Sequence, residues 1–300
     1  MADLKPIYMA TAHLQLTANI IFTNPGPFAA EGLEVRMVCP GSGIPIAQMV
    51  LNGRAEYNNV LALPIQWAVE GRPLKFVASY QNSGWELWTA PSIRTFADLQ
   101  GKPVGRSSPM ARKYLDMALR QNGIDPETVP HGQRVNLDYT AITDILTGRV
   151  AGATFMPPVT AMAKHAGLTC LAKLGDFGDP VAFGLMTSDA HLKKNRDEVR
   201  SVIRAMLNSV EMLKGDRNLA RRLVRDQGVS EDYVDITIDQ TLPQLNSHGR
   251  LDQASQHQWI SFGRELAGLK QEVPLSQVFD FSVLDEVSPA KAIPKSAKAR

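Results

Sequence analysis

The stretch from Arg106 to Pro109 carries the residue types best suited to holding a small anion. Arg106 ends a predicted strand, and Ser107 and Ser108 precede Pro109, a residue typical of the first position of a helix. A strand that runs into a serine-capped helix leaves backbone N–H groups pointing beyond the strand end. The helix dipole and Arg106 make this spot positive, which suits a carboxylate, a sulfonate or an acceptor-rich ring edge. An ordinary strand–helix turn in water has the same pattern, so both interpretations stay open.

Further candidate ligand-binding residues follow other predicted strands or flank the junction between the two halves of the chain. They are His13, Gln15, Ser42, Gly43, Asn59, Trp85 and Pro157. A histidine can pair with an anion below about pH 6.5, and glycine lets a ligand approach the backbone closely. An asparagine both donates and accepts hydrogen bonds, and a tryptophan can stack on an aromatic ring. Pro157 is predicted to mark the return of the chain from the second half to the first.

Cysteine usage argues against a metal centre and a disulfide framework. The chain has two cysteines, Cys39 and Cys170, and no Cys-x-x-Cys or Cys/His cluster. Cys39 could act as a nucleophile with His13 as its base, but we favour a buried cysteine at a strand end. We predict no catalytic residue, no metal and no cofactor.

Charge and hydropathy exclude several classes of partner. The formal net charge is +2, which gives no reason to expect binding to nucleic acid or to an anionic membrane. No run approaches the roughly 20 apolar residues of a membrane-spanning helix. The first residues lack the basic and apolar regions of a signal peptide. The chain is therefore cytoplasmic, or a mature secreted form with an added Met, and we expect a monomer.

Apolar runs and turn residues predict an α/β protein with two lobes. Strands are expected at 6–10, 33–39, 55–59, 74–80, 85–89, 102–106, 135–137, 150–156, 168–173 and 181–187. The intervening helices are expected at 16–22, 44–51, 61–69, 107–119, 139–146 and 159–165, with a stop at 24–27 and a turn at 28–31. Strands that alternate with helices favour a mostly parallel sheet, and ligands bind at the carboxyl ends of such strands. Amphipathic helices are then expected at 188–214, 218–227, 230–240 and 253–266.

The order of these elements predicts four segments. Residues 1–83 form the first part of lobe 1, 84–178 form lobe 2, and 179–287 return to lobe 1 with the C-terminal helices. Residues 288–300 form a disordered basic tail. Two crossings between the lobes make a hinge, and the cleft between lobes is where small molecules usually bind.

Five stretches in order resemble a known family. Residues 31–35 (EGLEV) are similar to its EGLDV strand, and 47–57 (AQMVLNGRAEY) to its ALxxGxADF unit. Residues 97–105 (ADLQGKPVG) are similar to ADLKGKKVG, and 146–158 (LTGRVAGATFMPP) to LxxGxVDAAxxxxP. Residues 191–205 resemble its helix after FLKxNP. The chain thus resembles the periplasmic substrate-binding proteins of ABC importers for nitrate, taurine, alkanesulfonates and thiamine-pyrimidine precursors, over roughly residues 5–215.

The resemblance implies a type II periplasmic-binding-protein fold and a function. It implies capture of a small polar or anionic molecule (a sulfonate, a carboxylate or a pyrimidine-like compound) between the lobes. The partners would then be that ligand and the membrane subunits of the importer, and the location would be the periplasm once a signal peptide is removed. The alternative is a cytoplasmic enzyme on the same fold, of the aromatic acid decarboxylase, sulfinate-cleaving or thiamine-pyrimidine synthase type. We favour the binding protein.

Overall fold

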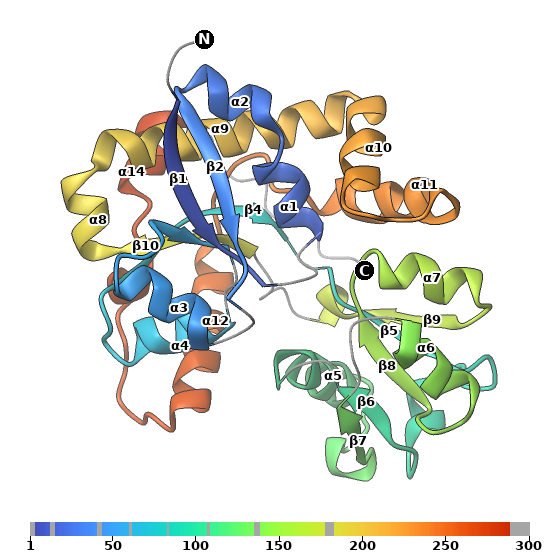
Figure 1. Ribbon diagram of the computed structural model, residues 1–300. Helices are drawn as coiled ribbons and strands as arrows, with labels where there is room; N and C mark the ends of the chain where they lie inside the picture. Colours follow the sequence, from blue (N-terminus) through green and yellow to red (C-terminus); the bar gives the residue numbers. More distant parts are fainter. Residues whose placement is uncertain are drawn as a thin grey trace.

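A computed structural model describes residues 4–12, 16–40, 44–59, 62–82, 84–106, 109–134, 139–177 and 183–288. The strands in these residues form two five-stranded sheets, one in each lobe (Figure 1). The two lobes and the helical C-terminal part agree with the fold that the sequence predicted. None of the helices in the described residues is long and apolar enough to cross a membrane.

The sheet of lobe 1 has the order β2-β1-β3-β10-β4. Its strands are β1 (Lys5–Ala10), β2 (Leu33–Val38), β3 (Tyr57–Asn58), β4 (Leu74–Gln81) and β10 (Phe183–Ser188). β1 runs parallel to β2 and β3, whereas β10 runs antiparallel to β3 and β4. The carboxyl ends of β1 to β4 therefore share one edge of the sheet with the start of β10.

The sheet of lobe 2 has the order β7-β6-β8-β5-β9. Its strands are β5 (Glu86–Thr89), β6 (Val104–Arg106), β7 (His131–Arg134), β8 (Gly152–Phe155) and β9 (Thr169–Lys173). β5 is antiparallel to β8 and β9, and β6 is parallel to β7 and β8. The carboxyl ends of β6 to β9 thus share an edge with the start of β5. Because β4 leads into β5 and β9 leads into β10, both crossings join these two strand-end edges.

Two groups of helices cover the sheet of lobe 1. α1 (Leu16–Phe22) and α2 (Pro25–Ala30) pack on the long helix α9 (Arg196–Gly215), at the top of Figure 1. α3 (Ile44–Leu51), α4 (Ala62–Val69) and α12 (Gln253–Ala267) form the second group, with α12 on α4. α9 is amphipathic, as expected for this part of the chain, and its apolar residues at helical spacing are all buried: Val199, Val202, Ile203, Met206, Leu207 and Val210.

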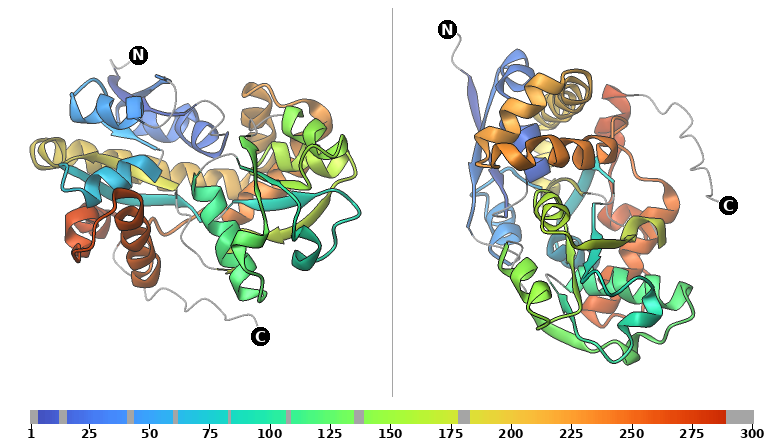
Figure 2. Two further views of the ribbon diagram at one scale, coloured as in Figure 1. Left: turned by 90° about the horizontal axis from the view of Figure 1, so that it is seen from below. Right: turned by 90° about the vertical axis from the view of Figure 1, so that its right-hand side faces the viewer.

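Lobe 2 carries three helices and has a core of its own. α5 (Pro109–Gln121), α6 (Tyr139–Leu146) and α7 (Val159–His165) lie around its sheet (Figure 2). Side chains of α6, α7 and β8 form a hydrophobic cluster separate from the main core: Trp88, Ala141, Ile142, Ile145, Val150, Ala153, Phe155, Val159, Ala163 and Leu168. The α5 side of lobe 2, including Leu115 and Leu119, belongs to the main core that continues into lobe 1.

The C-terminal helices contact both lobes. α10 (Arg217–Asp226) packs on α9, and α11 (Glu231–Thr241) packs on α7 of lobe 2. Thr160 Oγ1 donates a hydrogen bond of 2.7 Å to Gln240 Oε1, and the rings of His165 and Tyr233 meet edge to face. The last helices, α13 (Leu275–Val278) and α14 (Ser282–Val287), return to β4. This segment therefore joins the lobes on the side of the crossings.

Two local predictions were wrong, and a third concerns residues outside the described part of the chain. The helix expected at 16–22 ends where it was predicted to end, but the turn expected at 28–31 is mostly helical, because Pro25 opens α2; proline suits the first turn, where the backbone N–H has no helical partner. The single helix expected over 188–214 is broken at Asn195 into α8 (Asp189–Lys194) and α9, since asparagine favours helix ends. The strand expected at 135–137 lies outside the described residues, and β7 stands just before it.

Candidate functional site

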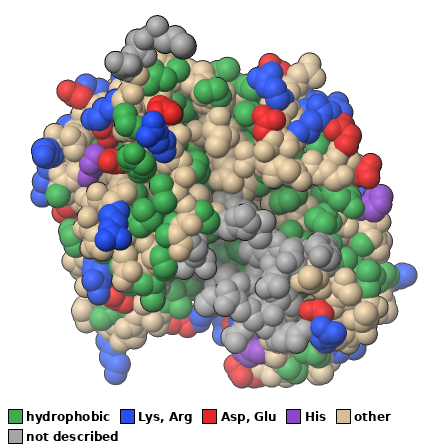
Figure 3. Space-filling model, in the orientation of Figure 1, with side chains coloured by type: hydrophobic (Ala, Val, Ile, Leu, Met, Phe, Trp, Pro, Cys, Tyr) green, Lys and Arg blue, Asp and Glu red, His purple; other side chains and the backbone are tan. Residues whose placement is uncertain are grey.

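At the edge of lobe 1 that faces lobe 2, the described strand ends carry amides and a hydroxyl but no charged side chain. This edge is formed by the residues at the ends of four strands, namely 10–12 after β1, 38–40 after β2, 58–59 after β3 and 81–82 after β4. None of these residues is Asp, Glu, Lys or Arg. Figure 3 shows this face of the molecule hollowed between the two lobes. The polar groups available at this edge are amides and the Thr11 hydroxyl, so it can recognise a ligand through hydrogen bonds.

Asn58 and Asn59, at the end of β3, are fully buried. The backbone of Asn59 is well held, since its N–H donates to Ala10 O and its carbonyl accepts from the Tyr80 hydroxyl at 2.8 Å. The side-chain amides, in contrast to the backbone, are unpaired: Nδ2 and Oδ1 of both asparagines lack a hydrogen-bond partner in the structure described. Each unpaired buried polar group costs about 1–3 kcal/mol, so such groups usually meet a ligand or an ordered water.

A group of amides marks the first crossing between the lobes. Gln81 Nε2 donates to Gln244 Oε1 at 3.1 Å, while Gln81 Oε1 is buried without a partner in the described part of the chain. A Cβ on Gly84 would lie 2.6 Å from Gln244 Oε1 and 3.1 Å from Met156 Cε. Side chains of lobe 1, lobe 2 and the C-terminal segment therefore meet at Gly84.

Glu86 begins β5, and Trp85 stands directly before it, beside the second crossing. Leu174 N donates to Trp85 O at 2.9 Å, which places the outgoing and returning chains side by side. Trp85 is 7% exposed and belongs to the main core, so most of its ring is engaged in packing. The Glu86 carboxylate is also buried and accepts from Trp88 Nε1 at 2.8 Å. Burial raises its pKa, against the opposing effects of Trp88 and of the charges of Lys173 and Lys164.

The prediction that Pro157 marks the return crossing was wrong. Pro157 follows β8 and lies just before α7, and the chain stays in lobe 2 for one more strand before it leaves. The reason is that β9 pairs with β5, so the sheet is completed only after α7. Pro157 nevertheless lies at the carboxyl end of β8, on the edge that faces lobe 1.

The remaining candidates can be placed only in part. His13, Gln15, Ser42, Gly43, Ser107 and Ser108 lie outside the described residues. For Arg106 the structure gives the backbone alone, at the end of β6 opposite Arg134 in the register. Pro109 begins α5, as predicted. In the chain these candidates directly follow β1, β2 and β6, three of the strands whose ends form the two facing edges.

Sequence reasoning missed three groups at the two edges. Asn58 was passed over in favour of its neighbour Asn59, although a polar pair ending an apolar strand was visible in the sequence. Glu86 was also missed, and its signal was an acid between two tryptophans in an otherwise apolar strand. Gln81 gave no signal, because its importance comes from its contact with Gln244. Among the described residues, no group of three or more His, Cys, Asp or Glu side chains is placed to hold a metal ion.

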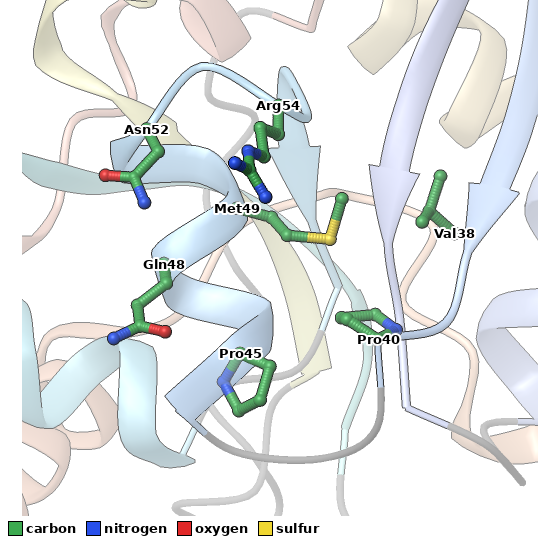
Figure 4. Close-up of a pocket in the computed structure, with 7 residues that line it drawn as sticks. All are labelled: Val38, Pro40, Pro45, Gln48, Met49, Asn52 and Arg54. Carbon is green, nitrogen blue, oxygen red and sulfur yellow. The ribbon is translucent and has the colours of Figure 1, made fainter.

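A pocket of about 350 Å³ lies between the end of β2 and α3, and Val38 and Pro40 of the edge belong to its lining. Figure 4 shows Met49 reaching from the helix towards Val38. The full lining is Val38, Pro40, Pro45, Gln48, Met49, Asn52 and Arg54. None of its polar side chains is a buried group without a partner, so it lacks the feature found at Asn58 and Asn59. Cys39 beside it is exposed, so the expectation of a buried cysteine was wrong: β2 is an edge strand.

An ion pair joins the lobes away from the crossings. Lys113 on α5 pairs with Glu265 on α12. We expect Lys113→Met to favour the open arrangement, changing the ratio of closed to open forms by up to about fivefold, because an exposed pair contributes about 0–1 kcal/mol. A donor and an acceptor fluorophore are attached to the exposed Cys39 and Cys170, which lie on different lobes. The efficiency of resonance energy transfer between them should fall when the lobes open. Burial raises the pKa of the Cys170 thiol to about 11, so Cys170 is labelled second and at higher pH.

The matched control for this pair is Lys193→Met, which removes a weak pair with Asp189 within one helix of lobe 1. Its transfer efficiency should equal that of the unaltered protein. An unchanged efficiency in Lys113→Met as well would show that the pair has no influence on the angle between the lobes.

Comparisons with known proteins agree with this geometry. The fold is similar to that of the periplasmic aliphatic sulphonate-binding protein SsuA from Escherichia coli, with 14% identity, a TM-score of 0.75, and coverage of 91% of this chain and 96% of that chain. It is also similar to the periplasmic nitrate-binding protein NrtA from Synechocystis PCC 6803, with 12% identity, a TM-score of 0.70, and coverage of 99% and 93%. A ligand-binding component of an ABC-type import system from Staphylococcus aureus gives 13% identity, a TM-score of 0.76, and coverage of 95% and 100%.

At these identities the likeness shows the fold alone, which is the periplasmic-binding-protein fold that the sequence motifs predicted. A comparison with curated protein sequences finds no match. The sequence profile described as NMT1/THI5-like matches residues 19–220, about two thirds of the chain. The protein belongs to the NMT1/THI5-like family.

Proposed function

We propose that this protein is a solute-binding protein that captures a small polar or anionic organic molecule between its lobes for an ABC importer. The observation that carries the proposal is the pair of buried, unpaired amides of Asn58 and Asn59 at a strand-end edge that faces the other lobe. A ligand enclosed there supplies the missing partners. Family membership and the likeness to the sulphonate-, nitrate- and ABC-type binding proteins support the same function.

Binding in this proposal works by closure of the lobes. The ligand is held by groups from both edges, so its hydrogen bonds are complete only when the lobes meet, and it shifts the equilibrium towards the closed form. Lobe 1 contributes the asparagines with His13, Gln15, Ser42 and Gly43, and lobe 2 contributes Trp85, Pro157, Arg106, Ser107 and Ser108. The start of α5 supplies backbone N–H groups for an anionic part of the ligand. No step of this cycle needs a catalytic group.

The partners and the location follow from the same proposal. The closed protein would dock on the membrane subunits of an importer, in the periplasm, after removal of a signal peptide. Lobe boundaries near residues 83 and 178, and a basic tail from residue 288, complete the proposed organisation. The proteins of similar fold are periplasmic binding proteins by description, which supports this location.

A thermal-shift series tests the proposal. Sulfonates, aromatic carboxylates and pyrimidines are screened for a dose-dependent rise in melting temperature; a ligand at 100 times its Kd stabilises by about 2.7 kcal/mol. Replacing Ser107 and Ser108 together by leucine should abolish the rise, while the ligand-free protein loses only the roughly 1 kcal/mol of a helix cap and stays folded. Ser261→Leu, at an exposed position of α12, is the control and should bind normally.

Two results would contradict the proposal. Normal binding by the double serine variant would remove these residues from the site. A hit that is converted into product over time would show catalysis and would exclude a function in binding alone.

A further inference from the structure

We infer that the part of the ligand that meets lobe 1 is uncharged and carries hydrogen-bond donors as well as acceptors, as a carboxamide, lactam or ureido group does. Asn58 and Asn59 are the residues that recognise this part of the ligand through hydrogen bonds. The inference rests on the proposed function and narrows it, because the sulphonate and nitrate named for the proteins of similar fold offer acceptors only.

The unpaired amide atoms of Asn58 and Asn59 indicate this class of ligand group. Each asparagine amide offers two N–H donors from Nδ2 and an acceptor at Oδ1. All four of these polar atoms, two nitrogens and two oxygens, are buried without a partner in the structure described. Successive residues of a strand point to opposite faces, so each amide is considered alone. An oxyanion pairs with Nδ2 and leaves Oδ1 unsatisfied. A carboxamide supplies a carbonyl to Nδ2 and an N–H to Oδ1 of the same asparagine, so it matches that amide in both directions.

The absence of basic residues at the described strand ends of lobe 1 also favours an uncharged ligand group there. The described strand ends of lobe 1 carry no lysine or arginine, so an anionic group would be taken out of water there without a countercharge. The basic residues of the facing edges belong to lobe 2, with Arg106 at the end of β6 and Lys173 at the end of β9. The buried carboxylate of Glu86 lies on the same edge of lobe 2. An anionic end of the ligand is therefore expected beside Arg106 and Lys173 and away from Glu86, with the neutral end towards the asparagines.

The asparagine backbones are fixed without help from their side chains. Asn58 pairs with Ala10 of β1 and with Met186 of β10, and Asn59 is held by Ala10 O and the Tyr80 hydroxyl. The two amides are therefore positioned before a ligand arrives, and a substitution that changes only the side chain leaves the strand end in place.

The first arm of the test needs no ligand. Asn58→Leu and Asn59→Leu keep the branched shape and remove the unpaired polar atoms, so the melting temperature of the ligand-free protein should stay the same or rise. Asn246→Leu is the matched control, because Asn246 is also buried but is satisfied: Nδ2 donates to Arg250 O, and Oδ1 accepts from the N–H groups of His248 and Gly249. This control should melt lower. A fall for Asn58→Leu and Asn59→Leu as large as the control's would show a structural role and overturn the inference.

The second arm uses probes matched in size. Succinamate is compared with succinate, and 4-carbamoylbenzoate with terephthalate; each pair keeps one carboxylate and exchanges the other for a carboxamide. By titration calorimetry the amide member should bind at least roughly tenfold more tightly, and Asn58→Leu should remove most of that preference. Equal or tighter binding of the diacids, methanesulfonate or nitrate would overturn the amide assignment and keep the solute-binding function. If no probe binds and no guest accompanies the purified protein, the proposed function fails and this inference with it.

Discussion

Replacing Gly184 by alanine should lower the free energy of unfolding by about 3 kcal/mol, the upper end of what overpacking usually costs. Gly184 lies in β10, in the middle of the sheet of lobe 1. A Cβ there would meet Ala78 O at 2.2 Å and the Phe76 ring at 2.4 Å. Both neighbours belong to β4, the strand that pairs with β10, so relief requires the two strands to separate. Thermal unfolding should show a fall in melting temperature on the order of 5–10 °C.

Gly215→Ala is the control for that measurement. Gly215 ends α9, and a Cβ at this position would meet no neighbouring atom within 4 Å. Alanine should therefore be neutral here or stabilise the protein by up to about 1 kcal/mol through its helix propensity. Equal melting temperatures for the two variants would show that β10 and β4 do not approach each other as closely as described.

The second prediction with a large expected effect on stability concerns Glu198 on α9. Its carboxylate accepts hydrogen bonds from His191 Nε2 at 2.9 Å and the Tyr57 hydroxyl at 3.0 Å, and pairs with Lys5 Nζ at 2.5 Å. Burial acts to raise the pKa of this carboxyl, but the hydrogen bonds from His191, Lys5 and Tyr57 outweigh burial and lower the pKa from 4.5 to about 2. The side chain is 8% exposed, so this cluster ties β1, β3, α8 and α9 together inside lobe 1.

Glu198→Gln should therefore destabilise the protein by about 3 kcal/mol at pH 7. A lowered folded-state pKa contributes stability that is fully present above the unfolded pKa near 4.5 and is lost as the pH falls through about 2. The difference between the unaltered protein and the variant, measured by urea unfolding at pH 7, 4 and 2.5, should shrink steadily. Glu34→Gln, at an exposed carboxylate paired with Arg36, should change little. A difference that is independent of pH would contradict the assignment.

Local chemistry explains which parts of the fold could be predicted from the sequence. Thr95 is a typical N-cap residue, and it forms a capping box with Asp98. Asp252 is another typical N-cap residue, and it accepts from Ser255 N at the start of α12. Pro109 opens α5. These features depend on residues within a few positions of one another, so their outcome is contained in the sequence itself.

The rest depends on contacts between residues far apart in the chain. Cys39 was expected to be buried because it follows an apolar strand, but β2 is the edge strand of its sheet, and strand order is not local information. Pro157 was misplaced for the same reason, because the pairing of β5 with β9 decides where the chain leaves lobe 2. Asn59 could be proposed from its position at a strand end. That its amide and that of Asn58 lack partners follows only from everything packed around them.

Native mass spectrometry of gently purified protein tests the central claim most directly. The account predicts one small molecule bound per chain, lost on unfolding, and absent from the Asn58→Leu/Asn59→Leu double variant prepared in the same way. A spectrum with only the bare chain for both proteins, together with melting temperatures that no sulfonate, carboxylate, carboxamide or pyrimidine raises, would contradict it.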